Sequence, residues 1–311
     1  MAQNDQPDSG TFFSKLLVAI DGSEISDYAL NFAIHIGENF SSKIDLIYVY
    51  ADMAPAAIAT PLYDPMSGPI LSPQPQFPAT DKAIHRIVSK NEALVHERKK
   101  LVEGRGIACE ALSIESDNIE GEILKRGNNY DLIVLGSRGL SGLQSLLLGS
   151  VSGKVAKEAK RSVLVVKNKI DRLPKILLAY DGSNEAKAAL EAAAAIGSKF
   201  GAQVDSIGVV SIPVLPEGMV IPENIGEWEK EMSGYVQEGT KLLNGKGITN
   251  STGKVLDATD VSKAITDEAA RGAYDLIVVG NRGYGRLKSF FLGSVAAGVA
   301  DNSKTNVLIV R

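Results

Sequence analysis

The sequence predicts an α/β fold made of two tandem, doubly wound domains, each with a five-stranded parallel sheet. One observation is an internal repeat: residues 130–151 and 274–295 are identical at fourteen of 22 positions, at a fixed offset of 144. The other is that short apolar runs alternate with amphipathic stretches in both copies, a pattern typical of parallel strands covered by helices on both faces. A length of 311 residues suits two domains.

A second pair of matching segments places the domain boundaries. LLVAIDGS at 16–23 aligns with ILLAYDGS at 176–183 at an offset of 160, so the first copy holds 16 extra residues between its matched segments. The expected organisation is an N-terminal tail at 1–14, a first domain at 15–168 and a second domain at 174–311.

The elements of the first copy follow from its hydrophobic periodicity. The first run, KLLVAI, is continuously apolar, and the next segment carries Ala29, Phe32, Ala33 and Ile36 on one helical face. The full expected order is strand 15–20, helix 23–40, strand 44–50, helix 81–103, strand 108–114, helix 118–127, strand 131–136, helix 150–160 and strand 162–166. The second copy repeats this order from strand 175–180 to strand 306–310, with right-handed crossovers.

The extra residues of the first copy coincide with a proline-rich segment. Residues 51–80 hold seven of the twelve prolines, a density that excludes a helix and a central strand because each proline removes a backbone donor. We expect a long surface loop there, either a tolerated insertion or a cover over a ligand cleft.

Composition excludes several classes of protein. A net charge of −4 offers no positive field for nucleic acid, and no apolar run reaches the ~18 residues that a membrane span needs. The polar start lacks a signal core, so a cytoplasmic setting is expected. The single cysteine, Cys109, excludes a disulfide framework and favours a buried apolar role over a redox or catalytic one. His35, His85 and His96 lie in predicted helices and favour structural roles over metal ligation.

Two loops of each copy carry candidate binding chemistry, because open parallel sheets bind ligands beyond the carboxyl ends of their strands. The first loop is Asp-Gly-Ser after the first strand, beginning at Asp21 and again at Asp181. The carboxylate there is able to accept hydrogen bonds from a purine amino group or a ribose. The alternative is that the aspartate or the serine only caps the following helix.

The second loop is glycine-rich and follows the fourth strand. It reads Gly136-Ser-Arg-Gly139, nine residues, then Gly149-Ser150, and the second copy repeats the spacing. Glycines let backbone N–H groups approach a phosphate, and a helix starting at the second Gly-Ser would direct its positive end at the same anion. Two arginines inside these turns, Arg138 and Arg282, either neutralise phosphate or lie in solvent or between the domains.

This two-part signature resembles the ATP-binding motif of the universal stress protein family, and the resemblance covers the chain from about residue 15 to 311. It implies an adenine-nucleotide α-hydrolase-like fold, with ATP held together with Mg²⁺ or Mn²⁺ through its phosphates. The implied nucleotide-binding residues are Asp21, Val49, Gly136, Arg138, Gly139, Gly149, Ser150 and Val151 in the first copy, and Asp181, Val209, Gly280, Arg282, Gly283, Gly293, Ser294 and Val295 in the second. It also implies that SVLVV pairs with NVLIV, so that the two domains form a pseudo-dimer within one chain.

The residues leave three functions open. The first is an ATP-binding stress-response or regulatory module with slow or no turnover, because a phosphate-loop lysine, a nucleophile elbow and a catalytic base are not evident. The second is an ATP-hydrolysing enzyme whose acid–base groups come from the proline-rich loop or a partner. The third is a ligand-free scaffold, against which the two intact signatures argue. Another adenine nucleotide, a homodimer of chains and an unknown signalling partner also stay open.

Overall fold

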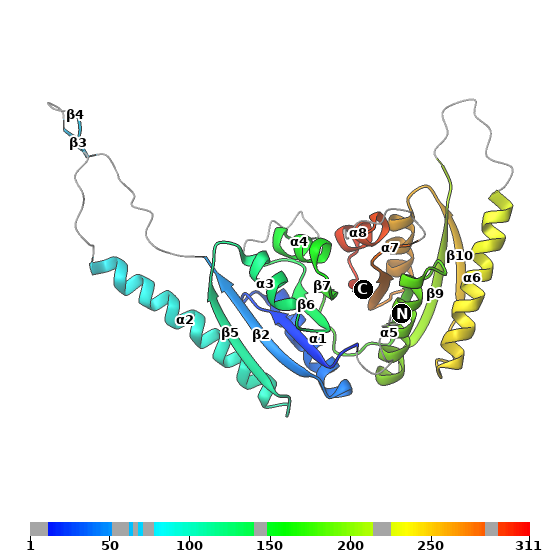
Figure 1. Cartoon of the computed structure of the whole chain (residues 1–311), viewed down its shortest axis with the longest axis horizontal. Helices are drawn as coiled ribbons and strands as arrows, with labels where there is room; N and C mark the ends of the chain where they lie inside the picture. The colour runs from blue at the N-terminus through cyan, green and yellow to red at the C-terminus, as the bar shows by residue number, and fades with distance from the viewer. Residues whose placement is uncertain are drawn as a thin grey trace, which may run out of the picture.

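The computed structural model describes residues 12–51, 62–64, 68–70, 78–139, 148–213, 225–283 and 292–311, and of residues 62–64, 68–70 and 78–88 it describes the backbone. One ten-stranded sheet runs through both halves of the chain (Figure 1). Its strands in the first half are β1 (Lys15–Ala19), β2 (Lys43–Tyr50), β5 (Cys109–Glu115), β6 (Leu132–Gly136) and β7 (Ser162–Val166). Those of the second half are β8 (Lys175–Ala179), β9 (Gln203–Ser211), β10 (Gly253–Ala258), β11 (Leu276–Gly280) and β12 (Asn306–Val310).

Four helices accompany the strands in each described half. The first half has α1 (Glu24–Phe40), α2 (Pro78–Glu103), α3 (Ile119–Gly127) and α4 (Ser150–Glu158). The second half has α5 (Asn184–Phe200), α6 (Ile225–Gly245), α7 (Val261–Arg271) and α8 (Ser294–Asn302). Every element expected in the first copy is present within three residues of its expected bounds.

The proline-rich segment differs from the expected loop in two respects. Leu62–Asp64 (β3) and Gly68–Ile70 (β4) pair as an antiparallel ribbon outside the main sheet, and α2 begins at Pro78 rather than at residue 81. Proline is tolerated at the first helical position because the N–H that it lacks would have no intrahelical acceptor. The remainder of the expected loop lies outside the described residues.

Each half has its strands in the same doubly wound order. Numbered locally, both halves read 3-2-1-4-5 with all neighbours parallel, which confirms the expected fold class. The halves meet at β7 and β12, which pair antiparallel with Leu164 opposite Leu308. The pairing of SVLVV with NVLIV that the resemblance implied is therefore present.

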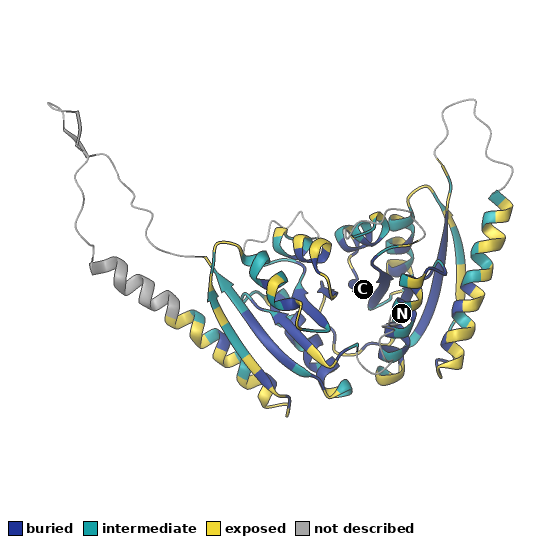
Figure 2. Cartoon of the chain, viewed as in Figure 1, coloured by how far each residue is buried: buried dark blue, intermediate teal, exposed yellow. Residues whose placement is uncertain are grey.

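Two hydrophobic cores lie on the two faces of the sheet. One face packs against α1, α2, α5 and α6, and the other against α3, α4, α7 and α8. Along β1, Leu16 and Val18 join the first core whereas Leu17 joins the second, as the two-residue period of a strand requires. Figure 2 shows the buried strands between helices whose outer faces are exposed. Burial on both faces explains why these strands are continuously apolar.

A cationic residue at the end of each repeat forms hydrogen bonds with the other half. Lys167 and Arg311 are 144 positions apart, the offset of the repeat. Lys167 Nζ donates to the carbonyl oxygens of Ala300 and Ser303, both at 2.6 Å, at the end of α8. Arg311 Nη2 donates reciprocally to the Ala156 carbonyl oxygen at 2.6 Å, near the end of α4. A cation at a helix C-terminus satisfies unpaired carbonyls and complements the helix dipole, so each half stabilises a helix of the other.

Replacing Lys167 with methionine is expected to remove a pH-dependent part of the stability. Burial lowers the pKa of the Lys167 ammonium from 10.5 to about 8; the charge of Asp301 opposes this shift and that of Arg138 adds to it. Between these two pKa values the unfolded chain holds a proton that the folded chain has released. The free energy of unfolding of the wild type should therefore rise relative to Lys167→Met between about pH 8 and about pH 10. Urea titrations across this range would measure it, and a constant difference between the two proteins would contradict it.

Candidate functional site

In each half the strand order reverses between the first and fourth strands. The chain leaves β1 toward β2 and β5 and then returns to β6 on the opposite side of β1, and β8 and β11 are related in the same way. Crossover connections diverge at such a point and leave a crevice at the carboxyl ends of the strands. Both loops singled out in the sequence follow these strands.

In each Asp-Gly-Ser turn, the serine and the aspartate side chains accept different hydrogen bonds. Ser23 caps α1 by accepting from the Ser26 N–H at 3.2 Å, and Ser183 caps α5 in the same way. Asp21 Oδ1 accepts from the Ser23 N–H at 2.9 Å, and Asp181 Oδ1 accepts from the Ser183 N–H at 3.0 Å. Serine is therefore the capping residue, and the aspartate holds the turn.

The second glycine of each Gly-x-x-Gly turn lies directly against this aspartate. A Cβ added at Gly139 would lie 2.3 Å from Asp21 Oδ2, and one added at Gly283 would lie 2.3 Å from Asp181 Oδ2. Any side chain there would displace the carboxylate. The requirement for glycine thus comes from a contact between the two loops, which are more than a hundred residues apart in sequence.

The first glycine of each turn lies close to the start of the helix that follows the first strand of its half. A Cβ at Gly136 would lie 3.1 Å from the Ser26 backbone nitrogen, and one at Gly280 would lie 2.7 Å from the Glu185 carbonyl carbon. Because these are backbone atoms, they have little freedom to move. Glycine here lets the end of the fourth strand pack closely on α1 or α5.

The second Gly-Ser begins a helix, as expected, in both halves. Gly149 and Gly293 are the N-cap residues of α4 and α8, and their N–H groups donate to the carbonyl oxygens of Ser137 at 2.7 Å and Asn281 at 2.8 Å. These bonds hold the helix start beside the Gly-x-x-Gly turn. A glycine cap has no side chain to accept from the first-turn N–H groups, which can serve an anion instead.

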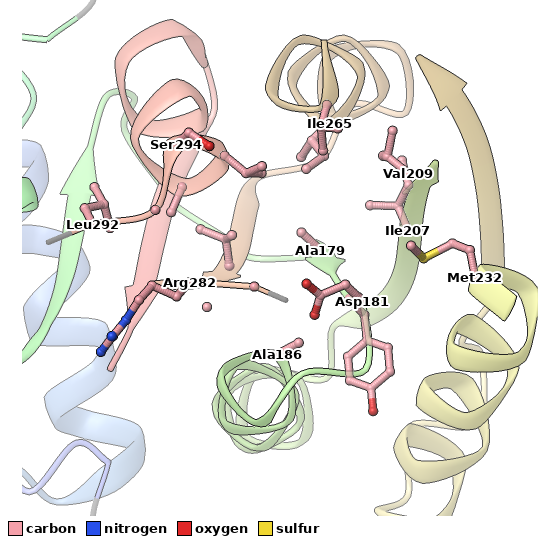
Figure 3. A pocket seen from close by; sticks show the side chains of 18 residues that line it. Ala179, Asp181, Ala186, Ile207, Val209, Met232, Ile265, Arg282, Leu292 and Ser294 are labelled. Atoms are coloured by element: carbon pink, nitrogen blue, oxygen red, sulfur yellow. The ribbon is translucent and has the colours of Figure 1, made fainter. Parts of the chain in front are cut away.

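In the second half these parts enclose a cavity of about 430 Å³ (Figure 3). Its lining includes all eight residues that the resemblance implied for this copy: Asp181, Val209, Gly280, Arg282, Gly283, Gly293, Ser294 and Val295. In Figure 3, Asp181 and Ser294 lie on opposite sides of the cavity. The volume is within the range of small-molecule sites.

An apolar wall completes this cavity, and the sequence analysis missed most of it. Ile207 on β9, Met232 on α6, and Val261 and Ile265 on α7 line it. Val261 and Ile265 are four residues apart at the start of a helix that follows a strand end, which is a signal that could have identified them. Met232 offered no such signal, because the placement of α6 depends on tertiary contacts.

The two arginines of the glycine turns extend toward the junction of the halves. Figure 3 shows the Arg282 guanidinium directed away from Asp181. Burial and the charge of Arg282 lower the pKa of the Arg311 guanidinium, and the charge of Arg138 acts likewise on Lys167. Each arginine is thus near the cation that links the halves. This placement favours the inter-domain alternative, although Arg282 also lines the cavity.

The first half brings its predicted residues to the corresponding place. Asp21 and Gly139 are in contact range, Gly136 ends β6, and Ser150 and Val151 open α4. Val49, at the end of β2, packs against the core that contains Ile47 and Ile123, the counterparts of Ile207 and Ile265.

Each half of the chain matches the model of one protein family. A family model described as the Universal stress protein family matches residues 13–167 and again residues 173–311. The chain belongs to the universal stress protein family.

Relatives of this universal stress protein include chains of the same length and chains of half the length. A universal stress protein of Mycolicibacterium smegmatis is 26% identical over 310 residues, covering 95% of this chain and 96% of its own. Universal stress protein YxiE of Bacillus subtilis is 29% identical over 157 residues, which is 50% of this chain and 99% of that protein. The crystal structure of a universal stress protein from Archaeoglobus fulgidus superposes with a TM-score of 0.66 at 24% identity, covering 97% of this chain and 98% of its own.

Cys109 is the single cysteine of this universal stress protein. Cys109 is buried, and burial raises the pKa of its thiol to about 12, which keeps the thiol protonated. Within the described ranges, the structure holds no group of three or more His, Cys, Asp or Glu side chains suited to a metal ion. None of the described helices combines the length and hydrophobicity needed to span a membrane.

Proposed function

We propose that each half of the chain binds one ATP at the reversal point of its strands, as a regulatory or stress-response module with slow or no turnover. The observation that carries this proposal is the cavity of about 430 Å³ lined by all eight residues expected in the second half. Its apolar wall suits a purine ring, and the Asp181 carboxylate would accept hydrogen bonds from a ribose hydroxyl or the purine amino group. The N-terminus of α8 and the glycine turn suit the phosphates.

Mg²⁺ or Mn²⁺ would be held through the phosphates rather than by a cage of side chains, since Mg²⁺ commonly keeps its waters and binds nucleotide phosphates. The residues proposed for the nucleotide in the first half are Asp21, Val49, Gly136, Arg138, Gly139, Gly149, Ser150 and Val151. The cytoplasmic setting expected from the sequence stays a prediction.

Calorimetric titration of nucleotide-free protein with ATP and Mg²⁺ tests the proposal, after denaturing extraction and chromatography have checked for co-purified nucleotide. We expect two ATP per chain, with weaker binding when the metal is chelated. No binding at concentrations that would reveal a dissociation constant of about 100 μM would contradict it and favour the scaffold function. Parallel titrations with ADP, AMP and cyclic AMP identify the preferred adenine nucleotide, and steady phosphate release would indicate the enzyme alternative.

A further inference from the structure

The internal repeat allows the two proposed sites to be compared position by position. The glycine of each Asp-Gly-Ser turn lies against the long outer helix of its half, at Leu94 on α2 and at Tyr235 on α6. Three residues before these contacts, Asn91 and Met232 therefore occupy equivalent places, one turn nearer the carboxyl edge of the sheet. Met232 lines the cavity of the second half. An amide in one site thus replaces a thioether in the other.

The strand residue that faces this helix position also differs between the halves. In the second half the strand residue is Gly208, and a Cβ there would lie 2.6 Å from Met232 Sδ, so the thioether lies directly over the bare backbone. Figure 3 shows Met232 pointing toward Ile207 and Val209. The end of β9 is buried around it, with Val209 only 9% exposed.

The first half has a polar pair in the same place. Tyr48 stands where the second half has Gly208, and its hydroxyl donates to Asn91 Oδ1 at 3.1 Å. Its ring stacks on that of Tyr50, with 5.9 Å between centroids. Burial raises the pKa of the Tyr48 hydroxyl, and the negative charge of Asp21 raises it further, which places this phenol within electrostatic reach of the predicted binding aspartate. Tyr48, Val49 and Tyr50 are all half-buried rather than buried.

These differences concern the same wall of the two proposed sites. A thioether over an apolar strand end makes a dry surface that contacts the faces of an aromatic ring favourably. A tyrosine hydroxyl and an amide at a half-exposed strand end keep water, and a ring that packs against them must displace that water without replacing all its hydrogen bonds.

We propose that the pair at this position, Met232–Gly208 in the second half and Asn91–Tyr48 in the first, sets the affinity of each site for adenine, with the second site the tighter. This inference rests on the proposed function. Its consequence is that the two halves fill at different ATP concentrations, so one chain responds to two levels of the nucleotide.

Exchange of the two residues tests this in the full-length chain. Wild-type protein titrated with ATP and Mg²⁺ should show two affinity classes that differ by about tenfold or more. Met232→Asn should weaken the tighter class about tenfold and leave the weaker one unchanged, whereas Asn91→Met should tighten the weaker class. Met232→Leu, which keeps the wall apolar, is the matched control and should retain the wild-type affinity.

The only tryptophan, Trp228, gives an independent readout of the second site. It lies four residues before Met232 in α6, on the same side of the helix, and is half-buried. In the wild type, its fluorescence should change over the ATP concentrations that fill the tighter site. This midpoint should move to higher ATP concentration in Met232→Asn and stay unchanged in Asn91→Met. Thermal unfolding of each variant confirms that it is folded.

The outcomes separate the two proposals. Two ATP bound with a single affinity that neither exchange alters would overturn this inference and leave the proposed function standing. A tighter first site, with Trp228 reporting the weaker class, would also overturn it. Absence of ATP binding by the wild type would overturn the proposed function itself, and this inference with it.

Discussion

Gly283→Val is expected to abolish nucleotide binding in the second half while the first half keeps its own ATP. The introduced Cβ would meet Asp181 Oδ2 at 2.3 Å, so the carboxylate must leave its position and the turn around Ser183 must shift. Loss of the carboxylate contact and obstruction of the phosphate region together should cost about 3 kcal/mol, or about 100-fold in affinity. Calorimetry should then count one ATP per chain.

Two matched variants control this experiment. Gly139→Val makes the same 2.3 Å collision with Asp21, so it should eliminate the other ATP. Gly234→Ala lies in α6, where an added Cβ meets nothing within 4 Å, and should leave binding unchanged while stabilising the helix by about 1 kcal/mol. Wild-type stoichiometry and affinity in Gly283→Val would show that the glycine turn is not part of a nucleotide site.

Asp205→Ala is expected to destabilise the second half by about 2–3 kcal/mol. Asp205 is 5% exposed at the start of β9 and accepts hydrogen bonds from the Thr252 N–H at 2.8 Å, the Thr252 hydroxyl at 2.7 Å and the Tyr274 hydroxyl at 2.9 Å. It therefore joins the loop before β10 to the loop before β11, at the edge of the sheet opposite the proposed site. Alanine would remove the shared acceptor of these donors, and water would replace it only in part, because Thr252 is exposed whereas Tyr274 is half-buried.

Tyr274→Phe is the graded control for this residue. It removes one donor and keeps the carboxylate, so about 1 kcal/mol should be lost. Urea unfolding followed by Trp228 fluorescence reports on the second half, because the sole tryptophan lies in α6. An unfolding midpoint of Asp205→Ala equal to that of the wild type would contradict the assigned role. Asp45 accepts from the Glu110 N–H and the Tyr130 hydroxyl at the same place in the first half.

Much of the proposed site was predictable because its signals are local. The aspartates and glycines directly follow apolar strands, and strand ends are read from a two-residue or continuous apolar pattern. The repeat strengthens each of these predictions, because both loops occur in both copies, each at the end of the corresponding strand, and chance poorly explains such a recurrence. This is why Asp181, Gly280 and Ser294 were expected together and are found around one cavity.

The residues that sequence analysis left open or missed depend on contacts between distant elements. The alternatives for Arg282 differ only in the direction of a long side chain, which Figure 3 shows directed away from Asp181. Lys167 reaches Ala300 and Ser303 more than 130 positions later, through contacts that no periodicity encodes. Met232 lines the cavity because α6 packs over Gly208, a residue of another element.

The sequence by itself determined the order of the strands and helices, the duplication and the positions of the glycine turns, because these follow from the short-range periodicity of the backbone and from the conformations that glycine permits. Only the tertiary structure decided the antiparallel register of β7 on β12, which cation binds the end of which helix, and that Asn91 and Met232 occupy equivalent places in the two halves. Those features arise from the packing of surfaces that are far apart in the chain, and packing depends on the shape of both partners at once.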